Sequence, residues 1–147
     1  MRPKGSKNLM SRPKTRILFM CVANAARSQM AEGLAKAFLG DDFEIQSAGS
    51  SPFRVSTTAI AVMKEVGIDI STHTSKSVED LPLEFVQNLD IVVTLCANEV
   101  CPNYITKAKR YHWPMPDPGG GSGTPDGQLQ LFREIRDAIS VKLKELK

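Results

Sequence analysis

No apolar run in this sequence approaches the length of a membrane-spanning helix. The basic start is followed by neither an apolar core segment nor a small-residue cleavage site, so a secretory signal is not expected. Cysteine is scarce: three residues, an odd number without an export signal, favour reduced thiols in the cytoplasm. Two histidines and no paired Cys-x-x-Cys motif give little basis for a metal site. These absences predict a cytoplasmic protein that uses neither a membrane nor a bound metal.

Acidic residues are absent from the first 16 positions, which carry six basic side chains. We predict a disordered basic tail over residues 1–14 and one domain over residues 15–147. The tail has no interleaved aromatic residues, so a nucleic-acid partner is not expected. At 147 residues and 41% hydrophobic composition, the chain has enough apolar residues for one globular core, and we expect it to be a monomer.

Strand-like and helix-like hydrophobic patterns alternate along this domain. Short apolar or alternating runs predict strands at 16–20, 43–46, 89–95 and 109–113. Helical periodicity predicts helices at 29–39 and 57–66, a short broken helix at 78–87 and a long C-terminal helix from Leu129. Residues 119–127, rich in Gly, Ser and Pro, are predicted to form a loop. The alternation predicts a single three-layer α/β domain with a four-stranded parallel sheet and helices on both faces.

Three residues with chemical potential follow predicted strands. Cys21 follows the first strand, Cys96 the third and Asp117 the fourth. Parallel strands end at one edge of the sheet, where ligands bind in folds of this class. We therefore expect these side chains to converge, although they are far apart in the sequence.

The segment after the first strand has the composition of an oxyanion-binding loop. Its backbone N–H groups, at a helix N-terminus, form a site for an anion and favour a thiolate over a thiol, so Cys21 is a candidate nucleophile. Arg27 adds a planar fork of donors that matches a tetrahedral oxyanion. Asn24 tolerates a left-handed backbone, and the Ser28 hydroxyl can donate to the sulfur or cap the helix. The loop residues are Val22, Ala23, Asn24, Ala25, Ala26, Arg27 and Ser28.

Two further groups could complete a reaction at this edge. Asp117 lies between two prolines, where a carboxylic acid could protonate a leaving oxygen. Cys96 and Cys101 are too widely spaced for a thioredoxin-like Cys-x-x-Cys. Beside a nucleophilic thiolate they favour a disulfide relay, and the alternative is a pair of buried structural thiols.

The sequence resembles the low-molecular-weight tyrosine phosphatase superfamily, and more closely its thiol-coupled arsenate reductases. The resemblance runs from about Thr15 to the C-terminus and implies a four-stranded parallel sheet with a phosphatase-type loop. It rests on Cys21-x5-Arg27-Ser28 with residues 29–33, and on the segments 47–49, 67–71, 94–96, 101–102, 112–113 and 117–118.

The resemblance also implies a mechanism. Cys21 attacks the arsenic of a bound arsenate held by Arg27, while Asp117 protonates the departing hydroxide. Cys96 then attacks the sulfur of the Cys21 adduct, which releases arsenite and leaves a Cys21–Cys96 disulfide. Cys101 attacks Cys96 in turn, and the Cys96–Cys101 disulfide is reduced by thioredoxin or by a glutaredoxin-type thiol system. No cofactor is bound, and phosphate and sulfate compete with arsenate for the loop.

Some relatives bind potassium near this loop, with ligands that match Asn24, Glu32 and Ser47. Their fourth, acidic position corresponds to Lys76, whose ammonium could occupy the place of the cation, so no potassium requirement is expected.

Arsenate and phosphate are nearly isosteric, so the loop alone leaves two other functions open. These are a tyrosine phosphatase working through a cysteinyl-phosphate and a non-catalytic oxyanion-binding module. Gly119 and Gly120 stand where the phosphatases carry an aromatic residue after Asp-Pro. Cys96 is the discriminating residue, because reduction of arsenic needs a second thiol.

Overall fold

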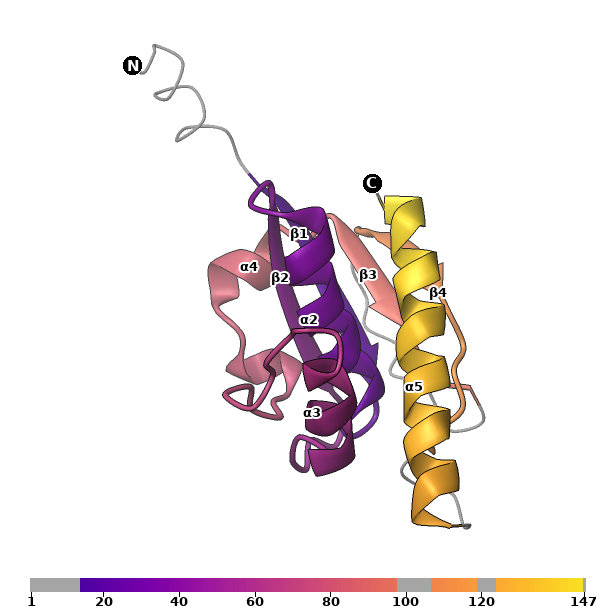
Figure 1. The fold of residues 1–147 in the computed structure, drawn as a ribbon. Coiled ribbons are helices and arrows are strands. Elements are labelled where there is room, and N and C mark those ends of the chain that lie inside the picture. The colour runs from indigo at the N-terminus through magenta and orange to yellow at the C-terminus, as the bar shows by residue number, and fades with distance from the viewer. Residues whose placement is uncertain (1–13, 98–106, 119–123, 147) are drawn as a thin grey trace.

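The structure is a computed structural model, and it describes residues 14–97, 107–118 and 124–146 (Figure 1). Its strands are β1 (Thr15–Cys21), β2 (Phe43–Gly49), β3 (Ile91–Thr94) and β4 (Lys109–His112). Its α-helices are α2 (Arg27–Leu39), α3 (Thr57–Lys64), α4 (Leu83–Gln87) and α5 (Pro125–Lys142). Short 3-10 helices occur at η1 (Val78–Asp80) and η3 (Leu143–Leu146). Among the described residues, no helix is both long and apolar enough to cross a membrane.

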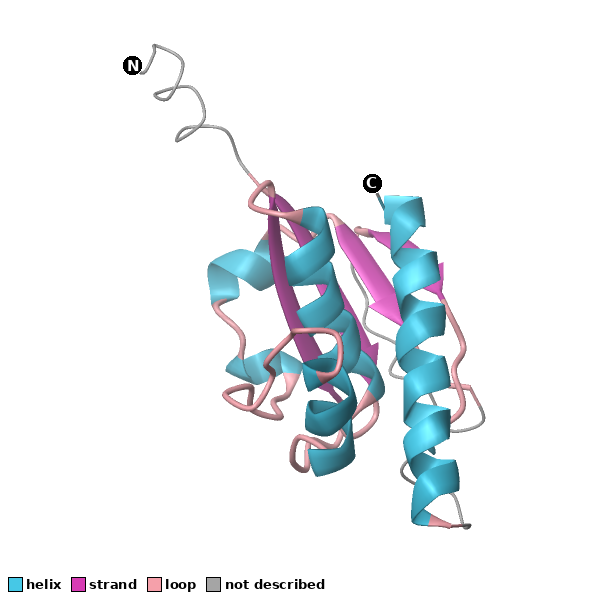
Figure 2. Cartoon of the chain, viewed as in Figure 1, coloured by secondary structure: helices cyan, strands magenta, loops and turns pink. Residues whose placement is uncertain are grey.

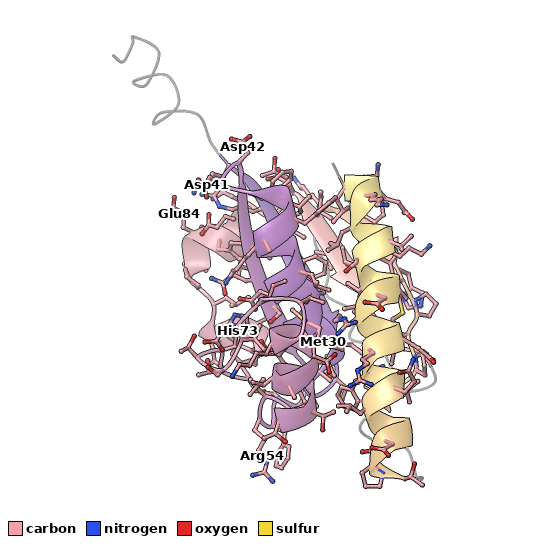
Figure 3. All side chains as sticks on the ribbon, viewed as in Figure 1. Met30, Asp41, Asp42, Arg54, His73 and Glu84 are labelled. Carbon is pink, nitrogen blue, oxygen red and sulfur yellow. The ribbon has the colours of Figure 1, made fainter. Side chains whose placement is uncertain are left out.

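The strands form one parallel sheet in the order β2-β1-β3-β4, which confirms the predicted fold class (Figure 2). Its register aligns Cys21 with Gly49, and Met20 with Thr94. The strands therefore end at a common edge. Figure 3 shows Arg54 at that end of the molecule, with Asp42 and Glu84 at the opposite end.

Both faces of the sheet are buried, as a parallel sheet with an apolar central strand requires. Along β1, Ile17 and Phe19 belong to one apolar cluster, whereas Leu18 and Met20 belong to another. The alternation follows from the two-residue period of a strand. Helices α2, α3 and α5 contribute to the first cluster, and α4 packs on the opposite face with the second (Figure 1).

Three helix boundaries differ from the sequence prediction, the first being the start of α2 at Arg27 instead of residue 29. Helix α5 begins at Pro125, inside the predicted 119–127 loop, because Thr124 caps it: its hydroxyl accepts a hydrogen bond from the Gly127 N–H at 3.0 Å. Proline in the first turn is compatible with a helix. The first backbone N–H groups of a helix have no intrahelical acceptor, so the missing N–H of proline costs no hydrogen bond. Helix α3 ends at Lys64, before the predicted limit of Val66, and the chain then turns through Gly67 with φ of 79°.

Candidate active site

A tight loop joins β1 to α2 at the carboxyl edge of the sheet. Asn24 lies within it at φ of 49°, the one positive φ among the described non-glycine residues. Ala26 occupies the N-cap of α2, and no described side chain caps that end, so Ser28 is not the cap that one interpretation of the sequence allowed. The first backbone N–H groups of a helix that lack a side-chain cap are the donors an oxyanion can use.

The nucleophile predicted from the sequence is in contact with a hydroxyl. Cys21 Sγ lies 2.9 Å from Ser28 Oγ, and both residues are buried. Ser28 Oγ accepts a hydrogen bond of 2.7 Å from the Asn24 side-chain amide. Its own hydrogen is therefore available to donate to the Cys21 sulfur.

Asn24 is held from several directions, which stabilises its left-handed backbone. The Gln29 side-chain amide donates to the Asn24 side-chain oxygen at 2.9 Å and to the Thr74 carbonyl at 3.0 Å. The Lys76 backbone N–H donates to the same Asn24 oxygen at 3.0 Å. Because the Gln29 amide nitrogen is the donor, its oxygen is the acceptor, and the His73 Nδ1 at 2.9 Å must carry the proton. Burial lowers the pKa of His73, which favours the neutral imidazole.

A buried carboxylate lies behind this loop. Glu32 accepts hydrogen bonds from Ser47 at 2.5 Å and from Lys36 at 2.6 Å, and the Lys76 ammonium lies 3.7 Å from it. Burial alone would raise the pKa of Glu32, but the hydrogen bonds from Lys36 and Ser47 and the charge of Lys76 bring it below its ordinary value. The Asn24 amide donates to Ser47 at 3.0 Å, so the carboxylate is linked to the loop. The ammonium of Lys76 thus lies beside Glu32, one of the three residues that matched potassium ligands.

The loop and its arginine enclose a hollow of about 220 Å³ at the sheet edge. Arg27 is buried, and its guanidinium donates to the Met115 carbonyl at 3.1 Å. Asp117 is among the lining residues, so the structure brings it together with Cys21 and Arg27. The remaining lining residues are Val22, Ala23, Ala25, Ala26, Ser56 and Phe132.

The second cysteine leaves the neighbouring strand at the same edge. The Leu95 N–H donates to the Met20 carbonyl at 3.0 Å, which places Leu95 level with the end of β1. Cys96 is the next residue along, so Cys21 and Cys96 emerge from adjacent strands. Both are buried. Cys101, the third cysteine of the predicted relay, lies outside the described residues.

The comparisons with known proteins agree with this geometry. The sequence model of the low molecular weight phosphotyrosine protein phosphatase family matches residues 16–147. The chain belongs to this family. It is 43% identical over 131 residues to the arsenate reductase of Bacillus subtilis (strain 168). The aligned residues cover 88% of this chain and 92% of that protein.

Two solved structures extend the comparison to three dimensions. An arsenate reductase in the phosphate binding state superposes with a TM-score of 0.72 at 35% identity, covering 90% of this chain and 95% of that one. The thioredoxin-dependent arsenate reductase Cg_ArsC1' of Corynebacterium glutamicum has a TM-score of 0.69 at 27% identity, covering 96% of this chain and 64% of that one.

Sequence reasoning missed several residues of this family member's site. Ser56 and Phe132 line the pocket, and Gln29 anchors Asn24. The position of Ser56 could have indicated its place in the pocket. Ser56 precedes the helix that follows the second strand, and that helix begins at the same edge of the sheet. Phe132 lies on α5, and its sequence position indicates only a core residue.

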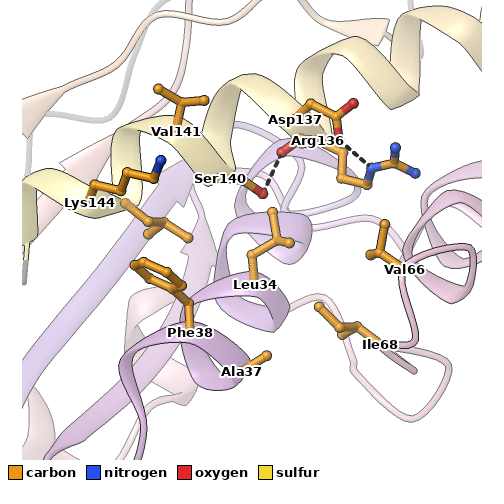
Figure 4. A pocket seen from close by; sticks show the side chains of 11 residues that line it. Leu34, Ala37, Phe38, Val66, Ile68, Arg136, Asp137, Ser140, Val141 and Lys144 are labelled. Carbon is orange, nitrogen blue, oxygen red and sulfur yellow. Dashed lines mark hydrogen bonds and ion pairs between the residues drawn. The ribbon is translucent and has the colours of Figure 1, made fainter.

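A larger hollow, of about 360 Å³, lies between α2 and α5 and has a different character (Figure 4). Its lining is mainly apolar, with Leu34, Phe38 and Val141 among the lining residues. Two of its charged lining residues pair with each other, since the Arg136 guanidinium donates to the Asp137 carboxylate at 2.8 Å. Cys21 lines the smaller pocket at the sheet edge and not this hollow.

Proposed function

We propose that the protein is an arsenate reductase that uses Cys21 as nucleophile and Cys96 and Cys101 as a disulfide relay. The observation that supports this most directly is the exit of Cys21 and Cys96 from adjacent strands at one edge, beside an oxyanion pocket. A relative that is 43% identical over most of the chain is named an arsenate reductase. The enzyme belongs in the cytoplasm, where a thiol pool can return its cysteines to the reduced form.

The first step forms a bond between sulfur and arsenic. The loop N–H groups and Arg27 hold the oxygens of an arsenate dianion, and the Cys21 thiolate attacks the arsenic. One oxygen departs and takes a proton from Asp117, which lines the same pocket. Phosphate and sulfate share the tetrahedral shape of arsenate and compete for the loop.

The second step transfers two electrons to arsenic. The Cys96 thiolate attacks the Cys21 sulfur, the electron pair of the sulfur–arsenic bond passes to arsenic, and arsenite leaves. Cys101 then attacks Cys96, which frees Cys21 as a thiolate and leaves a Cys96–Cys101 disulfide. An external dithiol takes up the oxidation and becomes a disulfide itself. We propose a thioredoxin-type reductant for this role, on the precedent of the thioredoxin-dependent enzyme of Corynebacterium glutamicum.

Phosphate-ester hydrolysis is the competing activity of this pocket, since the family is that of the phosphotyrosine phosphatases. A cysteinyl-phosphate needs only water for its release, whereas a cysteinyl-arsenate needs a second thiol to yield arsenite. We therefore assign the chain a residual aryl-phosphatase activity that does not depend on Cys96.

The Cys96→Ser variant tests the assignment. Arsenite production from arsenate with dithiothreitol should fall at least about a hundredfold, because the attacking thiol is lost. Hydrolysis of p-nitrophenyl phosphate should persist, which shows that the pocket remains intact. The Cys21→Ser variant serves as the control that loses both activities. Wild-type rates of arsenite release in Cys96→Ser would refute the relay.

A further inference from the structure

An exposed aromatic residue lies on the loop that supports the oxyanion pocket. Phe53 is 71% exposed, the largest exposed fraction among the described large hydrophobic residues. The Arg54 guanidinium lies 4.6 Å from the centre of its ring, so one face of the ring carries a cation. An aromatic side chain buries about 150–250 Å² of surface when it packs in a core or an interface. Most of the Phe53 ring lacks this burial in the isolated chain.

The backbone of residues 51–56 is hydrogen-bonded to the oxyanion loop. The Phe53 N–H donates to the Ala23 carbonyl at 3.1 Å, and the Ser51 N–H donates to the Val22 carbonyl at 2.9 Å. The Ser56 N–H closes the same stretch by donating to the Ala25 carbonyl at 2.9 Å. The backbone of Phe53 is therefore held against the oxyanion loop, and its ring is largely exposed to solvent.

The ring has no evident role toward the inorganic substrate. Neither Phe53 nor Arg54 is among the residues that line the pocket, and a tetrahedral anion bound there is enclosed by the loop. A partner for the ring must therefore be larger than arsenate and must approach the same edge of the sheet.

The proposed reaction requires such a partner, namely the dithiol protein that reduces the Cys96–Cys101 disulfide. Its contact area on this chain would be about 800 Å², a patch roughly 30 Å across. Strands β2 and β3 are two positions apart in the sheet, so their exits are separated by about 10 Å. A protein centred on Cys96 would thus cover the loop that follows β2. Aromatic and arginine side chains are also the residues most enriched in the energetic centres of interfaces.

We propose that Phe53, with Arg54 across its ring, is the docking contact for a thioredoxin-type protein reductant. The inference rests on the proposed function, because it presumes a disulfide for that protein to reduce. The reductant presents an apolar surface around its reactive thiol, and this surface covers the free face of the Phe53 ring. Its two thiols become a disulfide as the two cysteines of this chain regain their protons.

The test compares two electron donors in the full-length Phe53→Ala variant. With thioredoxin, recycled by thioredoxin reductase and NADPH, the KM for thioredoxin should rise about tenfold, as for a residue at the centre of an interface. With dithiothreitol, which needs no docking surface, arsenite production should stay within about twofold of the wild type. Phe53→Tyr keeps the aromatic ring and should restore the wild-type KM.

Leu83→Ala is the matched control. Leu83 is 69% exposed but precedes Glu84, which lies at the other end of the molecule (Figure 3), so its variant should leave the KM for thioredoxin unchanged. An unchanged KM in Phe53→Ala overturns the proposal, as does an equal rise in Leu83→Ala. A parallel loss with dithiothreitol also overturns it, because the ring then supports the pocket. A rise confined to the KM for aryl phosphate would assign the ring to an aryl substrate instead. Failure of the wild type to release arsenite with dithiothreitol would refute the proposed function itself.

Discussion

Gly49, the last residue of β2, lets the oxyanion loop approach the sheet more closely than any other residue would. A methyl group built at this position would lie 2.4 Å from the Val22 carbonyl oxygen and 2.9 Å from the Asn24 backbone nitrogen. Both neighbours are backbone atoms of the loop, so neither can move aside as a flexible side chain could. We predict that Gly49→Ala displaces the loop and impairs arsenate turnover.

The size of the effect follows from these distances. Carbon and carbonyl oxygen pack at about 3.3 Å or more, so the loop must shift by roughly 1 Å. A displacement of that size in catalytic groups costs about a hundredfold in rate. Overpacking a well-packed site also costs about 1–3 kcal/mol of folding free energy, which lowers the Tm by several degrees. We expect kcat/KM for arsenate to fall about a hundredfold while the protein remains folded.

The assay is arsenite production with dithiothreitol, together with the Tm with and without phosphate. Phosphate should raise the Tm of the wild type more than that of Gly49→Ala, because the shifted loop binds the anion poorly. Gly127→Ala is the matched control: its methyl group would meet only the Thr124 hydroxyl at 3.2 Å, in the first turn of α5. Activity of Gly49→Ala within threefold of the wild type would refute the argument from close approach.

Three further perturbations test other parts of the structure. Ser28→Ala removes a hydrogen bond to a charged sulfur worth about 1.5–3 kcal/mol, so kcat/KM with dithiothreitol should fall about tenfold to a hundredfold; a loss below threefold would contradict this. The hydrogen bonds from Arg133 lower the pKa of Glu65 to about 2, so its contribution to stability is present above the ordinary value of 4.5 and is lost as the pH falls towards 2. Glu65→Gln should therefore lower the Tm at pH 7 but not near pH 2, and an equal difference at both values would be inconsistent with the ion pair. Replacing potassium by sodium at fixed ionic strength should leave activity unchanged, because the Lys76 ammonium already lies 3.7 Å from Glu32; lower activity in sodium would count against it.

The convergence of Cys21 and Asp117 on one pocket could be predicted because it depends on topology. Parallel strands with crossover helices end at one edge whatever their exact lengths, so errors of a few residues in strand limits did not matter. The start of α5 was missed although Thr124 and Pro125 are typical helix-start residues, because the neighbouring glycines favoured a loop.

The support of the loop could not be predicted because it depends on the path of a distant segment. Thr74 and Lys76 contact Gln29 and Asn24 from about fifty positions along the chain. Hydrogen bonds between loops follow from tertiary placement, and local sequence patterns carry no information about them. The exposure of Phe53 is of the same kind, since composition predicts a buried ring.

The hydrogen bonds that lead to the Cys21 sulfur are directed by groups that do not touch it. Glu32 is an acceptor when ionised, so the Ser47 hydroxyl must donate to it. Ser47 is then left to accept from the Asn24 amide, whose second hydrogen goes to Ser28. Ser28 accepts from that amide, so its own hydrogen can be donated to the Cys21 sulfur 2.9 Å away. A protonated Glu32 could itself donate to Ser47, but the Asn24 amide would still donate to Ser28, because the Lys76 backbone N–H holds the Asn24 oxygen as an acceptor. Because the pKa of Glu32 is lowered, the carboxylate is ionised at neutral pH and Ser47 donates to it there, while the backbone N–H of Lys76 fixes the donors nearer to sulfur.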